Sequence, residues 1–180
     1  EGVFADEIAP IEIPQRRGQP VVVDADEGVR GDSTVESLGR LHPAFSKDGT
    51  ITAGNASPIS DGAAALVLTS RDYAEANGLT VLCTVGEAGQ VAGPDTQLHQ
   101  QPSRAINAAL AKAGWSLDEL DFIEVNEAFA AVGLASLKDL NYPWEKTNLH
   151  GGAIALGHPI GASGARLALH AALELHRRGS

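Results

Sequence analysis

A histidine among glycines marks the stretch of this sequence best suited to chemistry. The segment HGGAIALGHPIGASGAR runs from His150 to Arg166, and His158 stands in it between Gly157 and Pro159. A neutral imidazole takes up a proton near pH 7 and can then donate one, so this loop histidine suits acid–base catalysis. Glycines let backbone and ligand approach closely, and proline fixes the chain direction. The competing interpretation is a solvated loop histidine without a role.

Two further polar segments are candidates for the same site. Asn126 opens the motif NEAFA directly after the β-type run Asp121–Val125, and Ser57 lies in NASPISDGAAA. Each also has a purely structural interpretation. An asparagine before a helix is commonly an N-cap, and the serine segment is typical of a turn that leads into a strand.

Other kinds of site fit the sequence less well. Neither a GxGxxG motif directly after a strand nor a GKS/T motif is present, which argues against a nucleotide-binding loop. The six histidines form no H-x-x-x-H pair, so no metal site is predicted. The single cysteine, Cys83, lies in a β-type run and is interpreted as a small buried hydrophobic residue. A balance of 13 basic against 23 acidic residues gives a net charge of −10, which argues against a broad nucleic-acid surface.

Alternating elements predict how the candidate residues are positioned. Residues 1–60 are turn-rich, with a short β-type run at Val21–Val23 and a short helix opened by a capping box of Ser33 and Glu36. Beyond residue 62 the sequence predicts strands at 63–69, 80–91, 121–125 and 146–150. Between and after them it predicts helices in SRDYAEANG, from Ser103 to Gly114, in NEAFAAVGLASLKDL and in GARLALHAALELHRRG.

This alternation favours a mostly parallel sheet covered by helices, with residues 80–178 forming β-α-β-α-β-α. Ligands bind such sheets beyond the carboxyl ends of the strands. Asn126 follows the strand that ends at Val125, and the glycine cluster follows the strand that ends near Leu149, so we expect one shared site. We also expect an open sheet edge, which tends to recruit another chain, and therefore a dimer or a higher assembly.

The composition gives expectations about where the protein is located and about whether the chain is complete. No apolar run approaches the ~20 residues of a membrane span, and the acidic start EGVFADEIAP is unlike a signal peptide. A single cysteine fits a reducing compartment, so a cytoplasmic protein is expected. The sequence holds no methionine, which leads us to expect a fragment.

Several motifs together resemble the thiolase family, close to its acetyl-CoA acetyltransferase branch. They are VDADEGVR, LHPAFSKDGTITAGNAS, GNASPISDGAAA, NEAFA and GGAIALGHPIGASGAR, in the family's order and over essentially the whole chain. The resemblance implies an α/β fold: the layered thiolase fold, with a mixed, largely parallel sheet covered by helices, here incomplete. It implies a CoA-binding loop region at 1–60. The last strand and helix of the N-terminal domain would occupy 61–79, and a truncated C-terminal domain 80–180.

The resemblance also implies an activity. Thiolases form or cleave short-chain 3-ketoacyl-CoA through an acyl-cysteine, with CoA and acyl-CoA as substrates and no covalently bound cofactor. His158 is similar to the histidine that activates the nucleophilic cysteine and binds a thioester oxygen, and Asn126 to the residue that holds a water there. Ser57 resembles the residue that contacts pantetheine. The pantetheine tunnel is matched by Leu41, Phe45, Ala53, Ala128 and Phe129, and the nucleotide end of CoA by Arg30 and Ser37.

The sequence departs from the family in its cysteines. Thiolases carry a nucleophilic cysteine in the N-terminal half and an acid/base cysteine in a late C-x-G-x-G segment, and Cys83 matches neither. The chain by itself is therefore expected to be inactive, whereas the full-length parent is expected to be an oligomeric enzyme of fatty acid metabolism. The segment LHQQP stands where the family often has a Gly-Pro-rich turn, which leaves the acyl-chain length open.

Three alternatives remain at this point. A degradative 3-ketoacyl-CoA thiolase uses the same residues on longer acyl chains. A non-catalytic acyl-CoA or lipid-binding relative is a second, although the presence of both Asn126 and His158 argues against it. The third is a fragment that only docks on its missing half.

Overall fold

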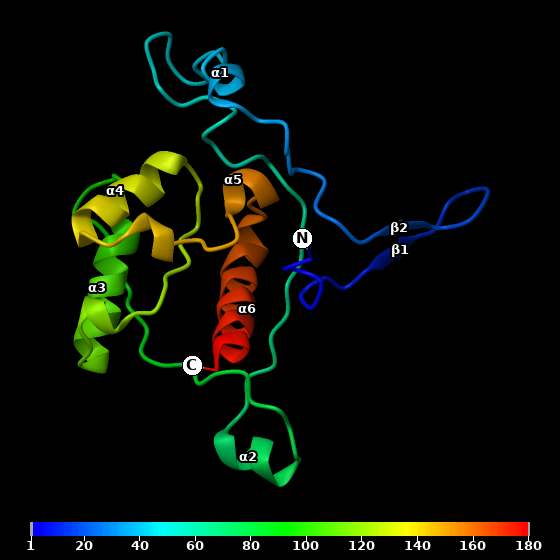
Figure 1. The fold of residues 1–180 in the computed structure, drawn as a ribbon, viewed down its shortest axis with the longest axis vertical. Coiled ribbons are helices and arrows are strands. Elements are labelled where there is room, and N and C mark those ends of the chain that lie inside the picture. Colours follow the sequence, from blue (N-terminus) through cyan, green and yellow to red (C-terminus); the bar gives the residue numbers. More distant parts are fainter. Residues whose placement is uncertain (1, 180) are drawn as a thin grey trace.

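The structure is a computed structural model of the chain, and it describes residues 2–179. Its body consists of helices, with α6 beside the pair α3 and α4 and with α5 at one end of α6 (Figure 1). The bounds are α3 Gln101–Ala113, α4 Ala130–Leu140, α5 Ala153–Leu156 and α6 Ile160–Arg178, with short 3-10 turns η1 Leu117–Glu119 and η2 Trp144–Lys146.

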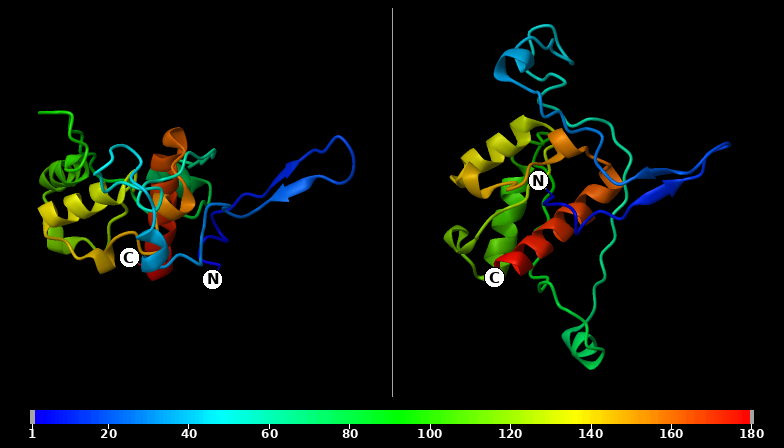
Figure 2. Two further views of the ribbon diagram at one scale, coloured as in Figure 1. Left: turned by 90° about the horizontal axis from the view of Figure 1, so that it is seen from above. Right: turned by 45° about the vertical axis from the view of Figure 1, so that its right-hand side comes forward.

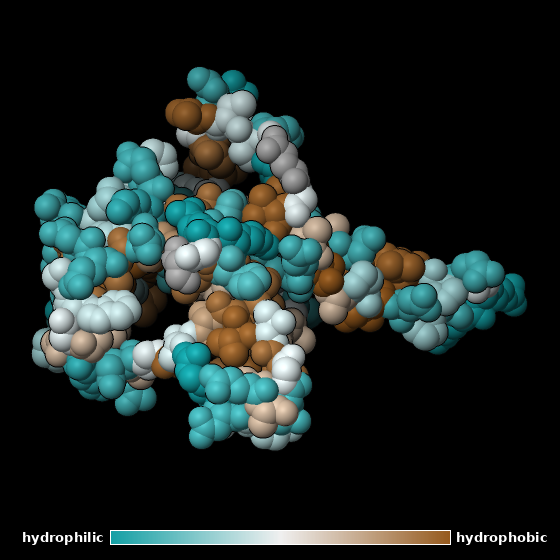
Figure 3. Space-filling view, turned by 60° about the horizontal axis from the view of Figure 1, so that its bottom comes forward, coloured by the Kyte–Doolittle hydropathy of each residue, from teal (hydrophilic) through white to brown (hydrophobic). Residues whose placement is uncertain are grey.

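Three parts project from this body. They are a hairpin of β1 Ile11–Ile13 and β2 Val21–Val23, a lobe around α1 Val35–Leu38, and a long loop that carries α2 Arg71–Ala76. The views in Figure 2 agree that the hairpin extends away from the helices. It is antiparallel, with Ile11 opposite Val23. Figure 3 shows brown apolar residues along its arm and teal polar residues at its tip.

Local signals define the helix ends. Gly114 and Gly179 adopt the left-handed conformation, each with φ of 71°, and end α3 and α6 as glycine C-caps do. The Ser70 side chain accepts the Tyr73 amide and caps α2. These ends confirm the predicted helices, although α3 begins at Gln101 rather than at Ser103.

Two predicted helix starts were wrong by a few residues. The capping box of α1 uses Thr34 and Ser37 instead of Ser33 and Glu36, because the Thr34 hydroxyl accepts the Ser37 amide at 3.0 Å. Helix α4 begins at Ala130, and its N-cap position is Phe129. Asn126 is therefore not the N-cap of this helix, which removes the structural interpretation of that residue.

The hydrophobic core lies between α4 and the segment that follows η1. Its buried members are Ile123, Val125, Leu140 and Tyr142. Two buried serines join α3 and α4 by polar contacts: Ser103 Oγ donates to Asp139 at 2.6 Å, and Ser136 Oγ donates to the His99 carbonyl at 2.8 Å.

The predicted strands at 63–69 and 80–91 do not form ladders. Both segments are irregular and run to and from α2 (Figure 1), and no backbone hydrogen bond ties either one to another part of residues 2–179. Val67 and Leu68 are 91% and 74% exposed. A strand is stable only with a neighbour that takes up its N–H and C=O groups, and the described chain supplies none for these two segments.

A trace of the predicted parallel pairing is present beside the core. Ile123 bridges Thr147 in parallel, with hydrogen bonds from the Ile123 amide to Lys146 and from the Asn148 amide to Ile123, both 3.0 Å. The predicted strands at 121–125 and 146–150 thus meet in the expected orientation, but they are reduced to one bridge. No helix in the described part of the chain is long and apolar enough to cross a membrane.

Candidate functional site

His158 and Asn126 lie in contact, as their predicted positions at neighbouring strand ends require. The Asn126 amide nitrogen Nδ2 is 3.2 Å from His158 Nε2, and both side chains are partly buried. His158 stands two residues before α6, and Asn126 directly follows the core residue Val125. A rigid core segment and a helix start therefore hold the two polar groups face to face.

The other nitrogen of His158 contacts Ser163, a residue that sequence reasoning missed. Ser163 Oγ is 2.6 Å from His158 Nδ1 and 3.1 Å from the Pro159 carbonyl oxygen. Ser163 lies in the first turn of α6 and is 3% exposed. The imidazole is thus held at both nitrogens, by Asn126 on one side and Ser163 on the other.

A second missed group, the side chains of Asn148 and Glu127, fixes the segment that carries Asn126. Asn148 accepts the Val125 amide at 2.7 Å and donates to the Val125 carbonyl at 2.9 Å, so its side chain continues the parallel bridge. It also donates to Glu127 at 2.6 Å, and the other Glu127 oxygen accepts the Ile154 amide in α5 at 3.2 Å. The NEAFA segment and the glycine-rich segment are therefore tied together next to the histidine.

Two of the glycines around His158 are required because neighbouring side chains pack directly against them. A Cβ at Gly152 would stand inside the Glu127 carboxylate, and one at Gly157, whose φ is 98°, would collide with Ser60. The expectation that the whole cluster makes room for a ligand was wrong for these two. Gly151, Gly161 and Gly164 face open space, because a Cβ there meets no atom within 4 Å, and these three match the expectation; Gly151 also has a positive φ of 92°.

The GNAS segment lies against NEAFA through backbone pairing. Ala56 and Phe129 form an antiparallel bridge, and the Ser57 amide and hydroxyl both point to the Ala128 carbonyl, at 3.1 and 3.2 Å. The Phe45 ring packs edge-on against Phe129, with centroids 6.0 Å apart. Four of the predicted pantetheine contacts thus come together: Phe45, Ser57, Ala128 and Phe129.

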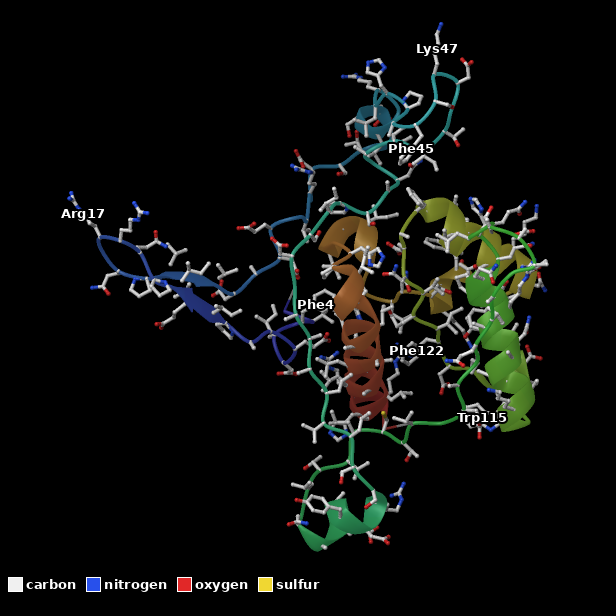
Figure 4. All side chains as sticks on the ribbon, turned by 180° about the vertical axis from the view of Figure 1, so that it is seen from behind. Phe4, Arg17, Phe45, Lys47, Trp115 and Phe122 are labelled. Atoms are coloured by element: carbon white, nitrogen blue, oxygen red, sulfur yellow. The ribbon has the colours of Figure 1, made fainter. Side chains whose placement is uncertain are left out.

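The remaining predicted binding residues lie in the lobe around α1. The Leu41 side chain packs so closely on Gly54 that a Cβ there would meet it at 2.7 Å, and Ala53 directly precedes Gly54 in the chain. Arg30 is exposed, and the Ser37 hydroxyl is occupied by the cap of α1. No described contact joins Arg30 or Ser37 to the His158 pair. Figure 4 shows that Lys47 in this lobe and Arg17 at the tip of the hairpin both point outward.

A hollow of about 790 Å³, open to the surface, adjoins Asn126. Its wall includes Ala128 and Val132 from the NEAFA side, and the rest comes from the start of α3 and from residues 89–92 and 98. Most lining residues are apolar, and polar groups are few, so the space suits an apolar group held beside the Asn126 amide.

A buried cluster of histidines and carboxylates lies along α6. His170, 1% exposed, contacts Glu7 at 2.6 Å and His150 at 3.1 Å, and the Phe4 ring lies 5.2 Å from it. The Glu124 side chain is 5% exposed, and neither of its oxygens has a hydrogen-bond partner among the described residues. Burial raises the pKa of Glu124 above its usual range, although the charge of His170, the Leu149 backbone amide and the charge of Arg166 oppose this shift.

The raised pKa of Glu124 gives a prediction about stability. The folded state holds this proton to a higher pH than the unfolded state, so the contribution of Glu124 to stability falls as pH rises from about 4.3 through the raised pKa. Glu124→Gln should therefore unfold at a higher temperature than the parent chain at pH 7, with the difference shrinking at pH 4. Thermal unfolding over this range measures it, with the exposed Glu75→Gln as the control. A variant less stable at pH 7 would mean that Arg166 and His170 outweigh the burial.

The described residues include no group of three or more His, Cys, Asp or Glu side chains placed to hold a metal ion. Cys83 is partly buried in the irregular segment 80–91. The two nitrogens of His158 face Asn126 and Ser163, so neither is paired with this thiol.

The helices, the parallel contact at Ile123 and the histidine–asparagine pair beyond it define an α/β protein with its polar site at the carboxyl edge of the parallel segments. Family models agree: the thiolase N-terminal domain matches residues 1–72, and the thiolase C-terminal domain matches residues 79–180. The chain belongs to the thiolase family.

Named relatives and solved structures extend this finding. The chain is 59% identical over 180 residues to a "Probable acetyl-CoA acetyltransferase" of Mycolicibacterium smegmatis, and it covers 46% of that protein. It is 50% identical over 177 residues to an acetyl-CoA acetyltransferase of Pseudomonas aeruginosa, of which it covers 45%. The chain thus spans about half the length of the curated relatives it matches.

The likeness in structure is equally close. The acetyl-CoA acetyltransferase of Bacillus anthracis superposes with a TM-score of 0.90 at 44% identity, over 99% of this chain and 45% of that one. Human mitochondrial 3-ketoacyl-CoA thiolase in complex with CoA gives 0.84 at 40% identity, over 99% and 44%. The predicted thiolase-like α/β fold is confirmed.

Proposed function

We propose that the whole protein containing this chain is an acyl-CoA C-acyltransferase. It would cleave acetoacetyl-CoA with CoA into two acetyl-CoA, or run the reverse condensation, through an acyl-cysteine. The observation that carries this proposal is the contact of 3.2 Å between Asn126 and His158, next to the GNAS segment that pairs with NEAFA. The names of the relatives, acetyl-CoA acetyltransferase above all, support it.

The roles of the pair follow from the charge that the reaction creates. Attack on a thioester, or formation of an enolate from acetyl-CoA, places negative charge on an oxygen, and one preorganised donor there is worth about 10²–10³ in rate. His158 would accept the thiol proton of the nucleophilic cysteine and then donate to that oxygen. Asn126 would hold a water at the same oxygen. The N-terminus of the 19-residue α6, two residues beyond His158, adds a favourable field for the developing charge.

The substrate would lie along the loop that pairs with NEAFA. Leu41, Phe45 and Phe129 offer apolar surface to the pantetheine arm, with Ala53 and Ala128 beside them, and Ser57 lies at its polar groups. The nucleotide end of CoA would reach the lobe around α1, where Arg30 and Ser37 lie. Since the chain has a net charge of −10, the exposed cations of residues 1–60 are its main attraction for this anionic substrate.

The location, the assembly and the metabolic role of the whole protein are also part of the proposal. The single cysteine favours a reducing, cytoplasmic location. The segments 63–69 and 80–91, which have no backbone partner among residues 2–179, and the apolar hairpin favour burial against further protein, either the rest of the whole protein or a second copy of it; we propose a homo-oligomer. A role in fatty acid metabolism follows from the substrate class.

A degradative 3-ketoacyl-CoA thiolase is the second candidate, and one observation favours it. The hollow beside Asn126 is open to the surface and lined mostly by apolar residues, which gives a longer acyl chain a surface on which to lie. If this hollow takes the acyl chain, 3-ketoacyl-CoA substrates longer than acetoacetyl-CoA would be cleaved as well.

The test is thiolysis by the intact protein across a series of 3-ketoacyl-CoA chain lengths. We expect turnover of acetoacetyl-CoA that iodoacetamide abolishes, because the acyl group passes through a thiolate. A kcat/KM that rises with chain length would select the degradative enzyme. Tight CoA binding without turnover would contradict the enzyme and favour a binding protein.

A further inference from the structure

We propose that Ser163 is a positioning residue that fixes the tautomer of His158. Its hydroxyl oxygen accepts a hydrogen bond from Nδ1–H, and Nε2 is thereby left as the basic nitrogen that faces Asn126. The catalytic meaning of this inference rests on the proposed function, but the tautomer is a property of the described residues themselves.

The first step is to account for the Ser163 hydroxyl proton. Ser163 Oγ has two close partners, His158 Nδ1 at 2.6 Å and the Pro159 carbonyl oxygen at 3.1 Å. A serine hydroxyl has one proton to donate and two lone pairs to accept with. The Pro159 oxygen only accepts: it takes the Ala162 and Ser163 amides at 2.8 and 2.9 Å and receives the hydroxyl proton as a third, shared contact. The contact with His158 is then satisfied when Nδ1 carries the ring proton.

The contact on the other side of the ring leads to the same assignment. The Asn126 nitrogen Nδ2 only donates, so at 3.2 Å it requires a lone pair on His158 Nε2. All three contacts are thus satisfied by a single proton arrangement. The opposite tautomer requires the Asn126 amide to be turned over and leaves the contact between Ser163 and Pro159 without a proton.

The burial of Ser163 strengthens its effect on the tautomer of His158. Ser163 is 3% exposed, so bulk water does not replace its oxygen as the acceptor for Nδ1. Loss of the hydroxyl would leave the Nδ1–H group of His158 without a hydrogen-bond acceptor, and an unsatisfied buried donor is unfavourable. With no partner on Nδ1, the ring is free to carry its proton on Nε2, where the lone pair is needed.

This tautomer sets the direction of proton transfer in the proposed reaction. The S–H bond of the nucleophilic thiol breaks, its proton forms the Nε2–H bond, and the sulfur keeps the electron pair. The imidazolium then donates Nδ1–H to Ser163 and Nε2–H to the thioester oxygen or the leaving group. Ser163 never exchanges a proton, and no further reactant is needed.

The experiment is nitrogen-edited NMR of the intact protein with isotope-labelled histidine, in which His158→Gln identifies the resonances of His158. Above the pH at which the ring is protonated, we expect the pattern of a protonated Nδ1 and an unprotonated Nε2. Ser163→Ala should shift this pattern towards Nε2–H, and Ser163→Thr, which keeps a hydroxyl, should retain it. Ser136→Ala is the matched control, because it removes a buried hydroxyl of α4 that donates to the backbone carbonyl of His99 and forms no hydrogen bond with His158 within the described chain.

Kinetics on the same variants supply a second readout. We expect Ser163→Ala to lower kcat by about ten- to a hundredfold with an unchanged KM for CoA, and Ser163→Thr to recover most of it. This is less than the ~10⁴ lost when the charged partner of a triad histidine is replaced, because a serine hydroxyl is neutral.

Two results would overturn the inference: Nε2–H in the parent protein, or an unchanged tautomer in a folded Ser163→Ala. An inactive protein with the expected tautomer would instead reject the proposed function and leave this inference standing.

Discussion

The 180-residue chain by itself is expected to give no thiolysis of acetoacetyl-CoA. Acyl transfer in this family passes through a cysteine that a histidine activates, and the chain contains only Cys83. That thiol lies in the irregular segment 80–91, while His158 is held at both nitrogens by Asn126 and Ser163. Serine hydroxyls near the histidine are no substitute, since Ser163 lies on Nδ1 and is engaged by the Pro159 carbonyl.

The measurement is the loss of acetoacetyl-CoA absorbance on addition of CoA, for the chain and for the intact protein at equal molar concentration. The intact protein should turn over, and the chain should match the rate without protein. A chain whose activity disappears in Cys83→Ala would contradict this expectation and would move the nucleophile into the described residues. Activity that survives in Cys83→Ala would be that of a contaminant.

The helices of this protein could be predicted from the sequence because their signals are local. Ser70 caps α2 through an amide three residues away, and Gly114 and Gly179 end α3 and α6 by adopting a conformation that glycine alone takes without cost. Such signals act within one turn of backbone. They therefore hold whatever the rest of the chain does.

The strands could be predicted only as tendencies. The apolar run at 63–69 has the composition of a buried strand, yet a strand exists only where a partner takes up its backbone groups. At Ile123 and Thr147 two such runs meet in parallel, and Asn148 supplies a side chain where the next backbone pair would be. The segments 63–69 and 80–91 find no such partner among residues 2–179, so their composition alone does not make them strands.

In the candidate site, too, one part could be predicted from the sequence and another part could not. The meeting of Asn126 and His158 could be predicted, because both follow runs that lie parallel to each other. The supports of the pair could not, since Glu127 reaches α5 and Ser163 folds back over Nδ1 only once α6 begins at Ile160. The position of Ser163, five residues after the histidine and in the first turn of a helix, is the signal that would have pointed to it.

His158→Ala in the intact protein is expected to remove two contributions to the rate together. One donor to the developing oxyanion is worth about 10²–10³ in rate, and general base catalysis about 10²–10⁴. Because one imidazole makes both contributions, they do not simply multiply. We expect kcat to fall by at least ~10³. Affinity for CoA should change little, since the predicted binding residues lie in the GNAS segment, its NEAFA partner and the lobe around α1.

Asn126→Ala should cost less than His158→Ala, because the proposed role of this amide acts through a water. Steady-state kinetics on both variants, together with calorimetric CoA binding, separates chemistry from affinity. The exposed His176→Ala, at the far end of α6, is the control for loss of a histidine as such. A His158→Ala protein that keeps a near-normal kcat but no longer binds CoA would assign the glycine-rich segment to substrate binding. The base would then have to be sought outside residues 150–166.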